Sequence, residues 1–112
     1  MQCNASTPVP GAITEEQLVV YGKGIFRLTL MAAVFADDDT IFLQILDVWK
    51  KIKNTPDYII PLFASLVITD SQLLEYTVEL LPIINEFSKD TLITVFQKYR
   101  HVVKESLDKL RL

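Results

Sequence analysis

Apolar residues recur at steps of three and four along most of this chain, which is the spacing of one face of an α-helix. The most regular stretch is the last one, with successive steps of 4, 3, 4, 4 and 3: Leu92, Phe96, Tyr99, Val103, Leu107 and Leu110. No stretch alternates apolar and polar residues for long, and no Asn-Gly or Asp-Gly hairpin turn occurs. The spacing therefore predicts an all-α protein.

Capping residues divide this pattern into about five helices. Thr14 begins the first helix, and Gln17, three residues later, completes a capping box. The aspartates of residues 37–40 end this helix and begin the next one. The later boundaries are marked by caps or by proline: Thr55-Pro56, Thr69-Asp70 and Ser88. We expect Pro82 to kink or split the fourth helix, and the last helix to run through about Leu110.

Five helices with short links predict a compact bundle. Residues 1–12 contain two prolines and a glycine among small and polar residues, which predicts a flexible N-terminal tail ahead of a single α-helical domain over residues 13–112. A shift of 35 residues lays apolar positions of residues 45–52 over those of residues 80–87. Stacked helical pairs, as in a short α-solenoid, are therefore the alternative architecture.

Two glycines, Gly22 and Gly24, lie in the middle of the first expected helix. Each costs roughly 1 kcal/mol relative to alanine in a helix interior. Either the helix bends at this point, or a neighbouring element packs very close to it.

The sequence indicates a reducing, cytoplasmic location. Its one cysteine, Cys3, cannot form an intramolecular disulfide, and the first residues do not have the pattern of a secretory signal. The longest apolar stretch, residues 24–36, has 13 residues, too few to cross a bilayer, so no membrane span is expected. Arg27 interrupts this stretch, and we expect it either to extend into solvent or to pair with Asp47, Glu75 or Glu79.

Groups for catalysis are scarce. The chain has one histidine, His101, and no nucleophile, metal or phosphate-loop motif. Helix capping explains the aspartates of residues 37–39 more simply than a metal site does, and the pair Glu75 and Glu79 is typical of a solvated helix face. We therefore expect no enzymatic activity, no catalytic or metal-binding residue and no cofactor.

Charge is unevenly distributed in a chain whose net charge is −3. Residues 69–87 hold four acidic and no basic residues, whereas residues 88–112 hold six basic and three acidic ones. The favoured interpretation is that two adjacent helices complement each other. The alternative is a basic face on the last helix that contacts an acidic partner or, less well supported at this net charge, nucleic acid.

High apolar content and broad helical faces without catalytic groups predict a non-enzymatic helical protein-interaction module: an adaptor, regulator or inhibitor. Its partner is expected to be another protein or a second copy of the chain in a homodimer. The expected interface residues combine apolar and basic side chains: Ile25, Phe26, Trp49, Lys98, Arg100 and Lys104. The alternative function is a small nucleic-acid-associated protein that uses the basic C-terminal helix face.

Overall fold

The computed structural model describes residues 13–110, and over this range the chain folds into six α-helices without a β-strand. They are α1 (Glu15–Phe35), α2 (Asp39–Asn54), α3 (Pro56–Thr69), α4 (Ser71–Asn85), α5 (Lys89–Lys98) and α6 (Arg100–Leu110). The all-α class is therefore confirmed, with one helix more than predicted. The expected tail, residues 1–12, lies outside the described residues.

Capping side chains begin four helices where the sequence predicts them, whereas Thr55 makes no side-chain cap hydrogen bond at α3, which begins at Pro56 as predicted. The backbone N–H of Gln17 donates to the Thr14 hydroxyl at 3.2 Å, and the Gln17 side chain accepts from the Thr14 N–H at 2.9 Å, which completes the capping box of α1. Side chains of Asp38, Asp70 and Ser88 likewise accept backbone N–H groups at the starts of α2, α4 and α5. Local hydrogen bonding thus fixes where these helices start.

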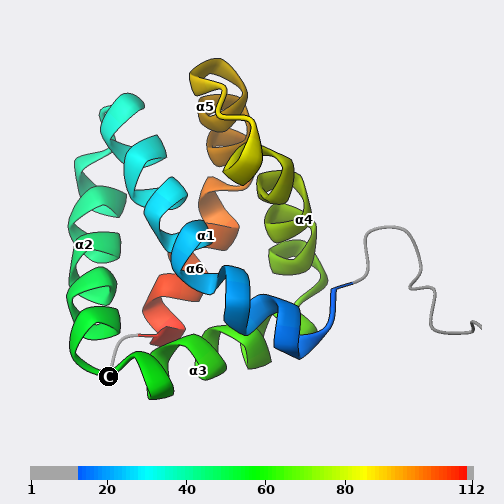
Figure 1. Ribbon diagram of the computed structural model, residues 1–112. Helices are drawn as coiled ribbons and strands as arrows, with labels where there is room; N and C mark the ends of the chain where they lie inside the picture. The colour runs from blue at the N-terminus through cyan, green and yellow to red at the C-terminus, as the bar shows by residue number, and fades with distance from the viewer. Residues whose placement is uncertain (1–12, 111–112) are drawn as a thin grey trace, which may run out of the picture.

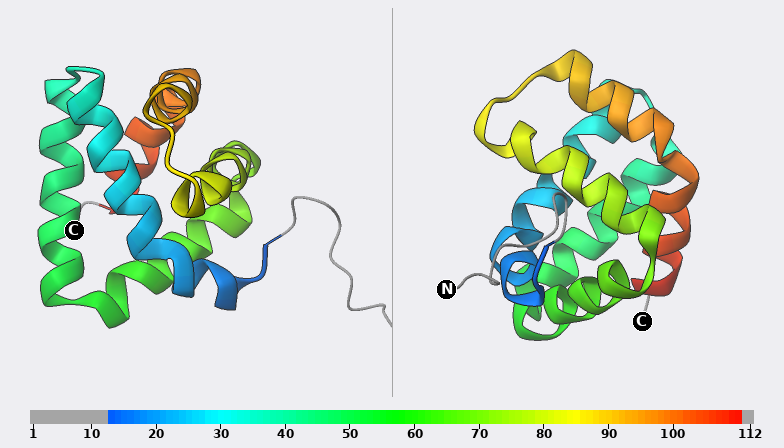
Figure 2. Two further views of the ribbon diagram at one scale, coloured as in Figure 1. Left: turned by 45° about the horizontal axis from the view of Figure 1, so that its top comes forward. Right: turned by 90° about the vertical axis from the view of Figure 1, so that its right-hand side faces the viewer.

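The predicted single helix after Ser88 is wrong at Tyr99, where the chain divides into α5 and α6. Tyr99 has ψ of 17°, outside the helical range, although its N–H still donates to Val95 and its carbonyl still accepts from Val103. Its ring lies 5.8 Å from that of Tyr76 on α4, and its hydroxyl donates to Glu79. These contacts accompany the bend between the two helices (Figure 2, right). Of the two expectations for Pro82, a kink or a split, the split is not seen, since α4 continues through it to Asn85.

The helices close around a shared core. In Figure 1, α1 crosses the front of the molecule, with α2 at one side, α4 at the other and α6 behind. α1 packs against α2, α3, α4 and α5, and α6 packs against α2, α3, α4 and α5. Because α1 contacts helices far beyond its neighbour in sequence, the arrangement is a closed bundle rather than a stack of helical pairs.

Close packing explains the first of the two glycines in α1. A Cβ atom at Gly22 would lie 2.9 Å from Cγ2 of Ile60, which is buried on α3. Helix α1 is unbroken from residue 15 to residue 35. The expectation of a close neighbour is therefore confirmed at this position.

Side chains from α1 and α6 meet at the centre of the core, around a cavity of about 20 Å³. The Thr29 hydroxyl of α1 and the Tyr76 hydroxyl of α4, 2.6 Å apart, border this cavity. A cavity of this volume has room for about one water molecule. This cavity is therefore too small for a larger ligand.

Helix α1 is also long and apolar enough to cross a membrane by length and composition. The bent pair α3 and α4 passes the same criterion if it is counted as one span. The sequence argument from a 13-residue stretch is therefore corrected, since the helix that contains it has 21 residues. The core helix of a bundle meets this criterion too, and the buried face of α1 packs against four other helices.

Candidate functional site

Two residues of the predicted interface lie in the core. Ile25 and Phe26 are 1% and 3% exposed, and the Phe26 ring lies 4.7 Å from that of Phe63 on α3. The prediction that they form a binding surface is corrected, because neighbouring helices cover this face of α1. Trp49 is half-buried on α2, with the Lys53 ammonium 5.9 Å from its ring centre.

The predicted basic face of the C-terminal helices is largely paired within the chain. Lys98 of α5 lies 3.4 Å from the Glu79 carboxylate of α4, as expected for helices of opposite charge. Lys104 lies 3.9 Å from Asp108, one turn later on α6. These two cations have carboxylate partners, whereas Lys109, exposed near the end of α6, has no ion pair among residues 13–110.

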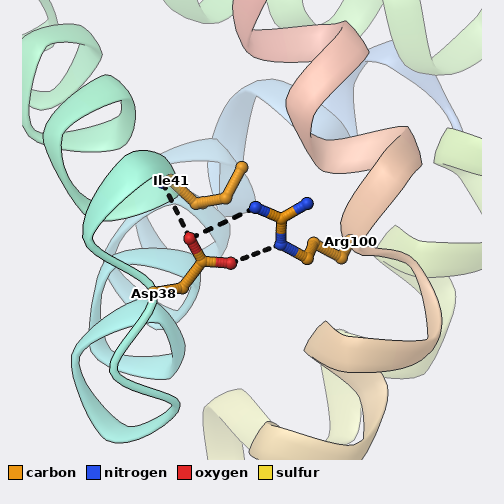
Figure 3. A network of polar contacts seen from close by, with 3 residues as sticks. All are labelled: Asp38, Ile41 and Arg100. Carbon is orange, nitrogen blue, oxygen red and sulfur yellow. Dashed lines mark hydrogen bonds and ion pairs between the residues drawn. The ribbon is translucent and has the colours of Figure 1, made fainter.

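Arg100, the third cation of that face, binds Asp38 at the start of α2 (Figure 3). Its Nε and Nη2 atoms donate to the two carboxylate oxygens at 2.5 and 3.4 Å. The same carboxylate accepts the Ile41 N–H at 3.1 Å as the N-cap of α2. The hydrogen bond from Arg100 holds the pKa of Asp38 below its usual range. Arg100 therefore attaches the α1–α2 turn to the start of α6.

A surface hollow of about 270 Å³ lies between the middle of α1 and the end of α4. Figure 2, right, shows the C-terminal half of α4 lying against α1. The hollow is mostly apolar and is lined by Gly24, Arg27, Leu28, Met31, Ile83, Ile84 and Phe87. We call it the α1/α4 hollow.

Gly24 forms part of the wall of this hollow. A Cβ atom at this position would lie 3.4 Å from Cδ1 of Ile84, the tip of a side chain that is only partly buried. On the far side of this contact a second hollow, of about 200 Å³, lies nearer the start of α1 and includes Tyr21 and Leu81. The absence of a side chain at Gly24 keeps the first hollow open.

Two cations on one side of α1 have no partner among the described residues. Arg27 lines the α1/α4 hollow and is exposed, and Lys23 is exposed one turn earlier on α1. Over residues 13–110, neither has an ion pair or a side-chain hydrogen bond. Of the two expectations for Arg27, extension into solvent is confirmed. Asp47 pairs with Lys51, and Glu79 pairs with Lys98.

Aromatic side chains form the other rim. Phe87 is 51% exposed, and its ring centre lies 6.3 Å from that of Phe35. The Lys89 ammonium lies 4.9 Å from the centre of the Phe35 ring. The hollow thus offers apolar surface with one cation, Arg27, in its wall and an exposed aromatic ring, Phe87, at its edge.

Elsewhere in the described part of the chain, the titratable side chains that meet form ion pairs or hydrogen bonds, as Lys98 and Tyr99 do with Glu79. No three His, Cys, Asp or Glu residues of residues 13–110 form a group able to hold a metal ion. His101 and Glu75 are exposed on α6 and α4, respectively. Cys3 lies outside the described residues.

Sequence reasoning singled out Gly24 and Arg27 but did not place them in one site. Each was an anomaly in an apolar helix, and the two are three residues apart on one face. The partner wall from α4 was missed, because the pairing of α1 with the end of α4 is a tertiary contact that local spacing does not encode.

By its fold and its surface hollow, the described part of the chain is a six-helix bundle with an apolar depression that has a cation, Arg27, in its wall. Comparison with protein-family models, with curated proteins and with solved structures finds no match.

Proposed function

We propose that this protein is a non-enzymatic binding module that holds a segment of another protein in the α1/α4 hollow. The observation that carries the proposal is an open apolar depression whose rim includes the half-exposed ring of Phe87. Binding hot spots in protein interfaces are apolar or aromatic anchors seated in such depressions. A volume of about 270 Å³ is slightly below the range typical of small-molecule pockets and suits one or two anchor side chains.

The alternative of nucleic-acid binding depends on a free basic face at the C-terminal helices. Lys98, Arg100 and Lys104 each have a carboxylate partner, and the net charge of the chain is −3. Because sequence-independent binding to nucleic acid depends on uncompensated positive charge, these pairs weaken the alternative. The proposal therefore remains protein binding.

Site-specific photo-crosslinking tests the proposal. A photoreactive phenylalanine analogue at position 87 reports on the hollow, and the same analogue at position 43 is the control, because Leu43 is 63% exposed on α2. In extract from the native source, we expect discrete protein adducts from position 87 and none of the same mass from position 43. An adduct of twice the mass of the chain would identify a second copy as the partner.

A blocking variant completes this experiment. Gly24→Leu places a side chain in the hollow at the expense of the flexible tip of Ile84, whereas Gly24→Ala leaves most of the volume open. The adducts should disappear in Gly24→Leu and persist in Gly24→Ala. Adducts that are the same at positions 87 and 43, or that Gly24→Leu leaves unchanged, would contradict binding in the hollow.

A further inference from the structure

We infer that the α1/α4 hollow selects an acidic protein segment, one in which a large apolar side chain is flanked by a carboxylate. This inference rests on the proposed function and adds the chemistry of the partner. Arg27 lines the hollow, Lys23 lies one turn earlier on α1, and Lys89, at the start of α5, lies over the ring of Phe35, which packs near Phe87. No carboxylate of the described residues lines it.

Cations near the hollow lack carboxylate partners, whereas several other cations of the described residues are paired. Lys51, Lys98, Arg100 and Lys104 all have carboxylate partners. Lys23 and Arg27 have none among residues 13–110. The acidic residues nearest to Phe87 in sequence, Glu86 and Asp90, are exposed and are not part of the lining. Lys50, Lys53 and Lys109 also lack an ion pair among the described residues, but at the hollow the free positive charge of Arg27 belongs to the wall of an apolar depression.

Arg27 fixes where a carboxylate of the partner would bind. Its guanidinium belongs to a residue of the hollow wall, so an apolar anchor in the hollow brings a flanking carboxylate within its reach. Arginine binds carboxylates with two parallel hydrogen bonds, which adds orientation to attraction. Lys23, exposed one turn earlier on α1, attracts carboxylates at other positions of the same segment.

The alternative occupants fit these features less well. Residues 1–12 of the chain contain no acidic side chain, so they offer the cations no partner. An anionic membrane surface provides negative charge, but it is suited to a protruding apolar face, whereas this site is a depression. An acidic peptide segment supplies both the anchor and the charge.

Selection from a displayed library of random peptides tests the inference on the full chain. Three targets are compared: the wild type, Gly24→Leu and the double variant Lys23→Glu/Arg27→Glu. Peptides enriched on the wild type are expected to carry an aromatic or aliphatic residue with Asp or Glu nearby and to be lost on Gly24→Leu. The double variant should instead enrich peptides in which Lys or Arg flanks the same kind of anchor.

Affinity measurements on one selected acidic peptide give the magnitude. We expect Lys23→Glu/Arg27→Glu to weaken binding about tenfold, because two exposed attractive pairs become repulsive. Raising the salt concentration should weaken wild-type binding and strengthen the residual binding of the double variant, because salt screens attraction in the first case and repulsion in the second. Circular dichroism of each variant shows whether the bundle is intact.

The possible outcomes separate the two proposals. Peptides that require the open hollow but show no acidic enrichment would overturn the charge inference and leave the binding module standing. A library without any peptide that Gly24→Leu excludes would overturn both. Binding to vesicles that contain phosphatidylserine, lost in Lys23→Glu/Arg27→Glu while no acidic peptide binds, would overturn the inference in favour of a membrane surface.

Discussion

The hydroxyl oxygens of Thr29 and Tyr76 lie 2.6 Å apart in the core and join α1 directly to α4. The Thr29 hydroxyl donates its single hydrogen to the Ile25 carbonyl at 2.8 Å. Tyr76 is therefore the donor in the bond between the two side chains. Both groups are buried, and this arrangement satisfies the tyrosine hydroxyl in surroundings that are otherwise apolar.

Removal of one partner of this bond should reduce the unfolding free energy by a different amount from removal of the other. Thr29→Val leaves the buried Tyr76 hydroxyl without an acceptor, which costs about 2 kcal/mol of unfolding free energy, whereas Tyr76→Phe removes one ordinary bond at about 1 kcal/mol. Urea unfolding of the two single variants and of the double variant measures both costs. The double variant should lose less than the sum, because once the tyrosine hydroxyl is gone no donor is left unsatisfied. Additive losses would contradict the bond.

The same tyrosine should govern stability in alkali. Burial raises the pKa of Tyr76, whereas a tyrosine in the unfolded chain titrates near 10. Because the pKa is raised in the folded state, the stabilisation is fully present below pH 10 and is lost as the pH rises above it. We expect the unfolding free energy of the wild type to fall by about 1.4 kcal/mol per pH unit more than that of Tyr76→Phe above this pH. Parallel curves for the two proteins would contradict the prediction.

Asp38 should govern stability in acid, in the opposite sense. Its pKa is lowered by the hydrogen bond from Arg100, so its contribution is present above the unfolded value near 4 and is lost as the pH falls through the lower folded value. Asp38→Asn keeps an N-cap for α2 but removes the charge. We expect it to cost about 1 kcal/mol at neutral pH, with the difference from wild type shrinking below pH 4.

Arg100→Gln is the matched control for this prediction. It removes the same ion pair from the other side and leaves the bond from Ile41 to Asp38 in place. In urea unfolding across the acid range, the unfolding free energy of both variants should therefore depend less on pH than that of the wild type. Combining the two substitutions should cause little further loss of stability. A pH dependence that survives in Arg100→Gln would show that another carboxylate is responsible.

Local chemistry in the sequence was sufficient for the helix starts. Thr14, Asp38, Asp70 and Ser88 satisfy N–H groups two or three residues ahead, and contacts this short depend little on the rest of the fold. The same holds for the pairing of Lys98 with Glu79, since consecutive helices of opposite charge lie side by side.

Features that depend on distant packing were missed. Nothing in the sequence around Tyr99 marks a bend, which coincides with contacts to Tyr76 and Glu79 on α4. Ile25 and Phe26 were assigned to an interface because the chain has a high apolar content and broad apolar helical faces, whereas four helices pack around α1 and bury both residues. The α1/α4 hollow was missed for the same reason, since its two walls are about 60 residues apart in the chain.

At the bend between α5 and α6, the ring of Tyr99 should matter more than the neighbouring ion pair. Tyr99 is 7% exposed and packs on Tyr76, so Tyr99→Ala should cost about 3 kcal/mol, as expected for a buried aromatic residue. Lys98→Ala removes an exposed ion pair and should change stability by less than about 0.5 kcal/mol. Thermal unfolding of both variants makes the comparison, and a larger loss for Lys98→Ala would assign the bend to charge instead.

The two glycines of α1 should respond to alanine with opposite signs. Alanine gains about 1 kcal/mol over glycine in a helix interior at either position. At Gly22 the new Cβ would lie 2.9 Å from the branched, buried side chain of Ile60, and overpacking of this kind costs about 2 kcal/mol, so a net loss near 1 kcal/mol is expected. At Gly24 the nearest atom is the tip of Ile84 at 3.4 Å, which can rotate away into the hollow, so Gly24→Ala should stabilise the bundle. Urea unfolding of the pair tests this directly, and equal gains at both positions would mean that α3 does not approach α1 as closely as described.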